Sequence, residues 1–371
     1  MSAFAQSHMM SAAVVAVALL LTTGRAFSPS RGISQRRASK FRTVVHSAPA
    51  VITEDQFMGM ISNAVVKKYG EAETKRVLDA FVRLGADVEH EGRVEFVSDT
   101  PPHEDGTALM VQKCRSRIEG LTLQPFHEPM DHKWCRTLAK EWTVVRDELT
   151  EKLSAQGANA LENVGNNIWV GAKNSTSAAE YGDKWKTLGL CDRGVWDADN
   201  TAIFPRTCEL LHRAGAPVIE ALFAKMPAKS TIGVHSDMVN FCLTFHLGVD
   251  VPEGECWIDV GDQRRHWENG GLLLFDTSIL HRAENTADRT RYIFMMRVWH
   301  PDLSDAERNA MQFVFDCLDE PEILTSGASL DDYDALRAQV EKESQDLWRN
   351  ALPSTTKTRK KRKPAGFGAK R

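Results

Sequence analysis

The stretch that decides the fold runs from residue 219 to residue 300, where short apolar segments alternate with turns. Four of these segments are NFCLTFHLGV (240–249), ECWIDVG (255–261), GLLLFDTSIL (271–280) and TRYIFMMRVW (290–299). They are rich in β-branched, aromatic and leucine residues and are separated by Gly, Asp, Asn and Pro, which is typical of strands joined by turns. Strands this short, separated at short intervals, predict a mainly β fold of the barrel or jelly-roll kind.

Helical patterns flank this region on both sides. Apolar residues recur at three to four in segments 54–84 and 131–154 before it, and again in 304–348 after it. Ser304 followed by Glu307 has the pattern of a capping box at the start of a helix. The sequence therefore predicts a β domain with α-helices at both ends.

Charge is distributed unevenly along the chain of 371 residues, whose net charge is −4. Residues 1–53 carry six basic and no acidic side chains, and residues 351–371 carry eight basic and no acidic ones. The remainder, 54–350, therefore has 32 basic and 50 acidic side chains. Because nucleic-acid binding needs a basic surface on the fold itself, this acidic core argues against a nucleic-acid partner. The basic C-terminal tail is expected to be solvated and disordered.

The first 50 residues have the composition of a targeting presequence. Residues 9–21 form an apolar run that is too short to cross a bilayer, and small residues suited to cleavage precede Phe27. The following stretch is rich in Ser and Arg and has no acid, as in transit peptides. This signal-plus-transit pattern resembles the presequences of algal complex plastids, so we expect a plastid location and no stable membrane span. The alternative is a plain signal peptide that leads to the secretory pathway or ER lumen.

The most informative polar residues lie in the β region. His235 and Asp237 are two positions apart, so on a strand they point to the same face, and His281 follows 44 residues after Asp237. Two histidines and one carboxylate that leave coordination positions open are the ligand set of non-haem Fe(II) oxygenases. We therefore predict that these three residues bind iron and form the catalytic centre.

A basic residue, Arg291, follows the second histidine in the sequence. Arg291 lies ten residues beyond His281 and opens the strand 291–299. An arginine there could pair bidentately with the distal carboxylate of 2-oxoglutarate. Arg289 is close enough to be the alternative candidate, and the sequence leaves the choice open.

From about residue 120 to residue 308 the chain resembles the aspartyl/asparaginyl β-hydroxylase family of 2-oxoglutarate oxygenases. The resemblance is carried by GLTLQPF (120–126), WTVVRDEL (142–149), PRTCELL (205–211), HSDMVNFCLTFHLGV (235–249), HWENGGLLLFDTSILHRAEN (266–285) and RYIFMMRVWHPDLSDAER (291–308). The last two segments, in this order and with these gaps, are specific to the family.

The resemblance implies a double-stranded β-helix fold that uses Fe(II), 2-oxoglutarate and O2. In this sequence His235 and His281 match the family's iron ligands, Arg291 matches its 2-oxoglutarate-binding arginine, and His246 matches a residue beside the co-substrate. The implied reaction is hydroxylation of an Asp- or Asn-type side chain or a related substrate, with release of succinate and CO2.

The chain also departs from the family pattern. Asp237 stands where the animal enzymes have Gly, whereas bacterial relatives that hydroxylate lipid acyl chains have a full triad. Thr244 replaces the family's Arg, and Ala224 replaces a Ser that helps to bind 2-oxoglutarate. Thr201 replaces a Cys, so the family's disulfide to the Cys208 position is not expected.

These observations leave two alternatives to hydroxylation of an Asp or Asn side chain. One is the same chemistry on a lipid or a small metabolite, and the other is a non-catalytic β-helix that serves as a binding module. The domain organisation that we predict is a presequence (1–50), a helical N-terminal region of unknown role (51–119), an oxygenase domain (120–308), C-terminal helices (309–350) and a basic tail (351–371).

Overall fold

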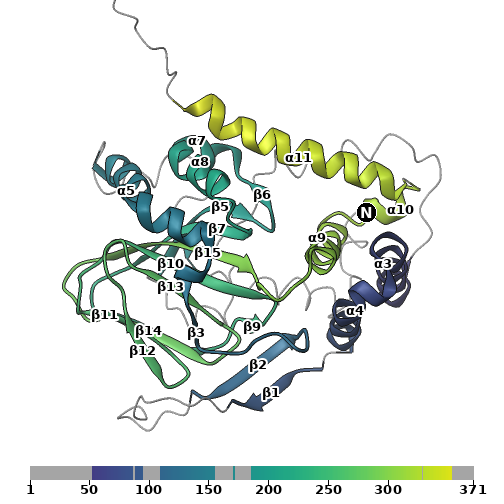
Figure 1. Ribbon diagram of the computed structural model, residues 1–371, viewed down its shortest axis with the longest axis horizontal. Helices are drawn as coiled ribbons and strands as arrows, with labels where there is room; N and C mark the ends of the chain where they lie inside the picture. Colours follow the sequence, from purple (N-terminus) through teal and green to yellow (C-terminus); the bar gives the residue numbers. More distant parts are fainter. Residues whose placement is uncertain are drawn as a thin grey trace, which may run out of the picture.

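The computed structural model (Figure 1) describes residues 52–86, 88–94, 109–154, 170–171, 185–327 and 329–352. The predicted presequence and the basic tail lie outside these residues, except for the first two positions of the tail. Among the helices within these ranges, none combines the length and apolarity needed to cross a membrane.

Two antiparallel sheets form the centre of the fold. The larger consists of β3 (Phe126–His127), β4 (Val170–Gly171), β5 (Lys186–Asp192), β6 (Val195–Trp196), β7 (Val218–Met226), β10 (Cys242–Asp250), β13 (Leu272–Phe275) and β15 (Arg291–Trp299). The smaller consists of β8 (Ser230–His235), β11 (Cys256–Val260), β12 (Gln263–His266) and β14 (His281–Asn285).

The chain winds back and forth between the two sheets. Between β7 and β15 the chain contributes strands to both sheets in turn. The smaller sheet has the order β12-β11-β14-β8, and the larger receives β7, β10, β13 and β15. The larger sheet has the order β3-β13-β10-β15-β7-β5-β4, and β6 pairs with β5. This antiparallel winding is a double-stranded β-helix, or jelly roll, which confirms the predicted fold class.

Strand β10 shows why the sequence adopts this arrangement. It lies between β13 and β15, and all of its residues except Asp250 are buried. A strand that is covered on both faces reads as a nearly continuous apolar run, as CLTFHLGV does. On its outer face Phe245 packs edge-on against Trp134 of helix α5 (Lys133–Ser154), with ring centroids 5.1 Å apart.

Helices cover the outer face and one edge of the sheets. In Figure 1, α5, α8 and α11 lie on one side of the larger sheet, and α3, α4 and α9 lie together at the end near β9. Their bounds are α3 (Glu54–Tyr69), α4 (Glu71–Gly85), η1 (Pro129–Asp131), α7 (Ala198–Ile203), α8 (Pro205–Ala214), α9 (Asp305–Asp319), α10 (Glu322–Thr325) and α11 (Leu330–Ala351). The predicted capping box of Ser304 and Glu307 is present at the start of α9.

The N-terminal region differs from its prediction. Residues 51–119 were expected to be helical, but besides α3 and α4 they contain two strands, β1 (His90–Arg93) and β2 (Val111–Ser116). Strand β2 pairs with β1 on one side and with β9 (Met238–Val239) on the other. Its side chains alternate between half-buried and buried although most of them are polar, so the alternation carries no hydrophobic signal in the sequence.

Candidate metal centre and co-substrate pocket

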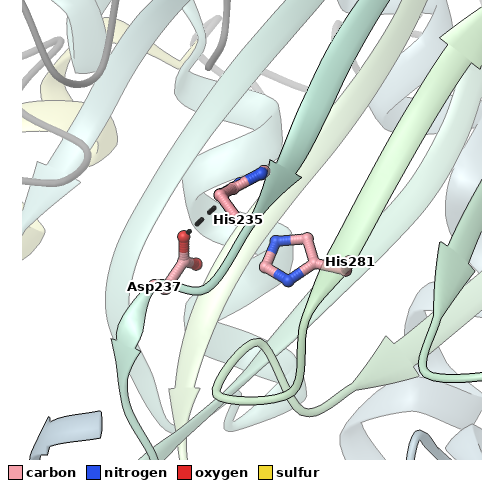
Figure 2. A group of neighbouring side chains, drawn as sticks. All are labelled: His235, Asp237 and His281. Atoms are coloured by element: carbon pink, nitrogen blue, oxygen red, sulfur yellow. Dashed lines mark ion pairs between the residues drawn. The ribbon is translucent and has the colours of Figure 1, made fainter. Parts of the chain in front are cut away.

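The structure brings His235, Asp237 and His281 together at one end of the smaller sheet (Figure 2). His235 is the last residue of β8 and His281 the first of β14; the two are directly paired, with ring centroids 4.1 Å apart. Asp237 follows β8, and its Oδ1 lies 3.9 Å from Nε2 of His235. One possible ligand atom from each residue lies within 4.8 Å of the others, so the cluster is compatible with one iron ion.

The backbone determines which nitrogen of each imidazole can bind a metal. Nδ1 of His235 lies 2.8 Å from the carbonyl oxygen of Gly233, and Nδ1 of His281 lies 2.8 Å from that of Ile279. Because a carbonyl oxygen only accepts, each Nδ1 carries the proton and donates it. Each Nε2 therefore keeps its lone pair, which is the form that coordinates a metal. Burial lowers the pKa of His281, which favours this neutral ring.

Asp237 is kept ionised by an arginine that the sequence analysis did not single out. Arg297 donates from Nη2 to Oδ2 of Asp237 at 2.9 Å, and its Nη1 lies 3.4 Å from Glu220. Burial alone would raise the pKa of Asp237, but Arg297, followed by the two histidines, lowers it below its ordinary value. A metal ligand must be deprotonated, so this pairing prepares Asp237 for that role.

A pocket extends from this cluster into the space between the two sheets. Its wall is mainly apolar and includes Leu222, Ala224, Ile232, Ile258, Ile293 and Met295. Arg291 and Arg297 of β15 also line the pocket. They are six positions apart, and because this number is even, both side chains point to the same face of the strand. The two guanidinium groups therefore mark different ends of the same pocket.

Within the part of the chain that the structure describes, Arg291 is a buried cation with no anion beside it. It is 2% exposed, its Nε has no hydrogen-bond partner within the described part of the chain, and its charge lies 4.2 Å above the ring centroid of Trp267. Burial lowers the pKa of Arg291 to about 10, and no carboxylate offsets that effect. A buried charge of this kind is costly unless a ligand supplies the opposite charge.

The alternative candidate, Arg289, has a different environment. It is an exposed residue whose Nη1 pairs with Asp250 at 2.7 Å, and both side chains are about half exposed. Arg289 does not line the pocket. Of the two arginines, only Arg291 is placed to bind a ligand next to the cluster.

His246 is oriented by a neighbouring indole. Nε1 of Trp267 donates to Nδ1 of His246 at 3.2 Å, so the proton of the neutral His246 ring is on Nε2. The ring also packs edge-on against Phe275, with centroids 4.9 Å apart. Burial, followed by the charge of Arg291, lowers the pKa of His246 well below its ordinary value. His246 therefore presents a neutral N–H donor in the pocket that Arg291 lines.

Of the four positions that depart from the family pattern, Asp237, Ala224 and Thr244 line the pocket, and Thr201 does not. Ala224 is paired across the sheet with Ile293, and Thr244 is paired with Arg297. Arg297, on the adjacent strand, places a guanidinium beside Thr244 at this end of the pocket.

Sequence reasoning missed Arg297, its partner Glu220 and the pocket role of Trp267. Arg297 is separated from Arg291 by an even number of strand positions, which was the available signal that both face inward. Glu220 is partly buried and paired across the sheet with Arg297, but strand pairing could not be derived from one sequence. Trp267 is 1% exposed and lines the pocket, which its sequence position alone did not indicate. Asp276 accepts from the backbone N–H of Ser278, and Asn285 donates to the carbonyl oxygen of Arg289, so both stabilise loops near the site.

The fold and the cluster together define a class: a double-stranded β-helix with a two-histidine, one-carboxylate site between its sheets. Residues 139–301 match the family described as Aspartyl/Asparaginyl beta-hydroxylase. Residues 139–301 are therefore similar to the aspartyl/asparaginyl β-hydroxylase family, as the sequence motifs indicated, and this similarity supports a hydroxylase.

Curated relatives agree with this assignment. A human protein named Aspartate beta-hydroxylase domain-containing protein 2 is 35% identical over 150 residues, which cover 38% of this chain and 39% of that protein. The mouse Aspartyl/asparaginyl beta-hydroxylase is 27% identical over 212 residues, covering 55% of this chain and 27% of that protein. The chain thus matches well under half the length of either protein.

A bacterial relative has a different named activity. The Ornithine lipid ester-linked acyl 2-hydroxylase of Rhizobium tropici is 25% identical over 185 residues, covering 49% of this chain and 63% of that protein. Among solved structures, a cupin domain from Schizosaccharomyces pombe matches 31% of this chain and 61% of its own, at 10% identity and a TM-score of 0.22. That likeness is too distant to add to the strand pairing described above.

Proposed function

We propose that this chain is an Fe(II)- and 2-oxoglutarate-dependent hydroxylase that acts on an Asp- or Asn-type side chain or a related substrate. The observation that carries the proposal is Arg291, a buried guanidinium without a carboxylate partner, in the same pocket as the His235–Asp237–His281 cluster. The distal carboxylate of 2-oxoglutarate is a planar anion, so it could form the bidentate ion pair that the guanidinium of Arg291 does not make with any described carboxylate.

The donor set fits iron. Nε2 of His235, Nε2 of His281 and Oδ1 of Asp237 would hold the ion and leave positions open for the co-substrate and O2. When bound, Fe(II) and 2-oxoglutarate supply the oxidant that converts C–H to C–OH; one oxygen atom of O2 enters the substrate and the other enters succinate as CO2 leaves. The chain's own residues bind and orient: Arg291 pairs with the carboxylate, His246 donates from Nε2, and the apolar wall excludes water.

Two features bear on the substrate. The relatives named as aspartyl/asparaginyl and aspartate hydroxylases favour an acidic or amide side chain. A lipid acyl chain is the second candidate, because the pocket wall is mainly apolar, Asp237 completes the triad, and one relative is named as an acyl hydroxylase.

The proposal is tested on the full chain, purified without oxygen and loaded with Fe(II). Titration with 2-oxoglutarate should give a visible metal-to-ligand charge-transfer band, and admission of air should give succinate. Arg291→Gln should weaken 2-oxoglutarate binding about 10- to 150-fold, the range for loss of a charge-assisted hydrogen bond of about 1.5–3 kcal/mol. Arg289→Gln is the matched control and should bind 2-oxoglutarate as the wild type does, because Arg289 pairs with Asp250 at the surface.

Iron binding without a band or succinate would contradict the proposal and favour the non-catalytic binding module. Loss of the band in Arg289→Gln instead of Arg291→Gln would mean that the co-substrate lies elsewhere. Once turnover is established, the substrate is assigned by the compound that increases succinate formation: peptides that contain Asp or Asn, or lipids with an ester-linked acyl chain.

A further inference from the structure

We infer that strand β2, which precedes the family-matched segment, sets the relative position of the two loops that carry the metal ligands. This inference rests on the proposed function and assigns a role to a region whose sequence gave none. The first loop follows β8 and contains Asp237; the second, residues 276–280, leads into His281.

The first loop is bonded to β2 through the residue between two ligands. Oγ of Ser236 lies 2.6 Å from the carbonyl oxygen of Lys113, its nearest acceptor, and 3.1 Å from that of Ser278, and it accepts from the backbone N–H of Met238 at 3.0 Å. Met238 has a φ of +64°, a left-handed conformation that a non-glycine residue adopts only when its surroundings hold it there. Cys114 of β2 pairs in parallel with Met238, so β2 supports this loop through both backbone and side-chain contacts.

The second loop is bonded to the same part of β2. The backbone N–H of Lys113 donates to the carbonyl oxygen of Ser278 at 2.8 Å, and that of Leu280 donates to the carbonyl oxygen of Val111 at 2.9 Å. The side chain of Gln112, which is 4% exposed, donates to Oγ of Ser278 at 2.8 Å. Three consecutive residues of β2 therefore determine where this loop lies before it reaches the metal site.

Lys113 links the two loops directly, because its carbonyl accepts from Ser236 and its N–H donates to Ser278. Asp237 lies outside the strands, and its N–H reaches the second loop at Thr277. A ligand on a loop is only as well placed as the hydrogen bonds that hold the loop, and metal sites tolerate errors of only about 0.5 Å. The contacts of β2 thus act on the metal ligands through the loops, which makes Gln112 and Ser236 positioning residues.

The far end of β2 is anchored to the body of the fold. The side-chain amide of Asn240 accepts from the backbone N–H of Ile118 and donates to its carbonyl, both at 2.8 Å. Arg83 of helix α4 donates to the carbonyl oxygen of Arg117 at 3.1 Å. These contacts connect the N-terminal helices to the strand that holds the loops.

The inference is tested by titrating Fe(II), without oxygen, into the full-length wild type and the variants Ser236→Ala, Gln112→Met and Ser236→Thr. Loss of a residue that supports a metal ligand typically weakens metal binding about 10- to 100-fold, which we expect for Ser236→Ala and Gln112→Met. Ser236→Thr keeps the hydroxyl and should recover most of the affinity. The control is Ser344→Ala in α11, which also removes a buried hydroxyl, one that donates to Val340 at 2.7 Å.

Thermal melting of the metal-free proteins separates positioning from general destabilisation. The inference requires that Ser344→Ala keep wild-type Fe(II) affinity even where its melting temperature falls as far as that of Ser236→Ala. Should Gln112→Met and Ser236→Ala bind Fe(II) within twofold of the wild type, β2 does not position the site, and the proposed function still stands. If Ser236→Ala fails to fold, Gln112→Met decides alone. A wild type that binds no Fe(II) would overturn both proposals.

Discussion

Two arginines on one strand show how the two ends of the pocket differ. Arg291 and Arg297 both point inward from β15, and both are buried, at 2% and 6% exposure. Arg297 is paired with Asp237 at 2.9 Å and lies 3.4 Å from Glu220, whereas Arg291 faces the ring of Trp267 and has no carboxylate partner among the described residues. Two buried arginines in one pocket thus differ: carboxylates balance the charge of Arg297, and no described carboxylate balances the charge of Arg291.

This difference distinguishes a charge that forms an ion pair within the protein from a charge that is placed to bind a ligand. A buried ion pair is self-sufficient, and it is disrupted when one partner is removed. A buried cation without a partner destabilises the folded chain unless an anion binds to it. The charge balance around each arginine, more than its position in the sequence, therefore distinguishes a structural group from a binding group.

The largest effect that follows concerns the stability of the metal-free protein. Arg297→Leu would leave the buried Asp237 without its arginine, so we expect a loss of about 3–5 kcal/mol in the free energy of unfolding. Arg291→Leu removes a charge that no acid balances, so the loss should stay within about 1 kcal/mol or become a gain. Urea unfolding of the two variants measures both values.

The comparison also predicts that the wild type and Arg291→Leu differ in their stabilisation by the co-substrate. Because a ligand stabilises the folded state that it binds, 2-oxoglutarate added to the Fe(II)-loaded proteins should raise the melting temperature of the wild type clearly more than that of Arg291→Leu, which keeps the metal ligands. Equal destabilisation by the two substitutions would show that Arg291 has a structural partner, and the contrast between the ends would be lost.

Two buried carboxylates, Asp237 and Asp276, differ in the direction of their pKa shifts, which makes the comparison testable by pH. Arg297 lowers the pKa of Asp237, whereas burial raises the pKa of Asp276 to about 7, despite hydrogen bonds from Ser278. The folded protein thus holds the Asp276 proton up to about pH 7, while the unfolded chain releases it near pH 4. Asp276 therefore favours folding at low pH, and this contribution is lost as the pH rises from about 4 to about 7.

Asp276→Asn should remove that dependence. Relative to the variant, the free energy of unfolding of the metal-free wild type should fall by up to about 4 kcal/mol between pH 4 and pH 7. Chemical unfolding of both proteins across this range gives the difference, in which the other titrating groups cancel. A difference that stays constant with pH would place the Asp276 pKa near its ordinary value.

The sequence predicted the fold and the cluster because both depend on local patterns. The runs 240–249 and 290–299 contain the apolar residues of covered strands, and the spacing of His235 and Asp237 is a property of one short segment. Arg297 and β2 could not be found in this way. Their roles come from contacts with residues far away in the chain, such as Glu220 for Arg297 and Ser278 for β2, and a single sequence does not encode strand register in a readable form.

The smallest expected effect concerns the indole ring of Trp267, which lies against the guanidinium of Arg291. Trp267→Phe keeps an aromatic face beneath Arg291 but removes the N–H that donates to Nδ1 of His246. The proton of His246 is then no longer confined to Nε2, and the cation–π contact weakens, so 2-oxoglutarate should bind about 5- to 10-fold less tightly, a cost of roughly 1–1.4 kcal/mol. Trp257→Phe is the matched control: Trp257 stacks with Arg264 at 3.6 Å and does not line the pocket, so its loss should leave 2-oxoglutarate affinity unchanged. Equal effects of the two substitutions, measured by the charge-transfer band, would mean that Trp267 acts only through packing and that His246 needs no fixed proton to serve the pocket.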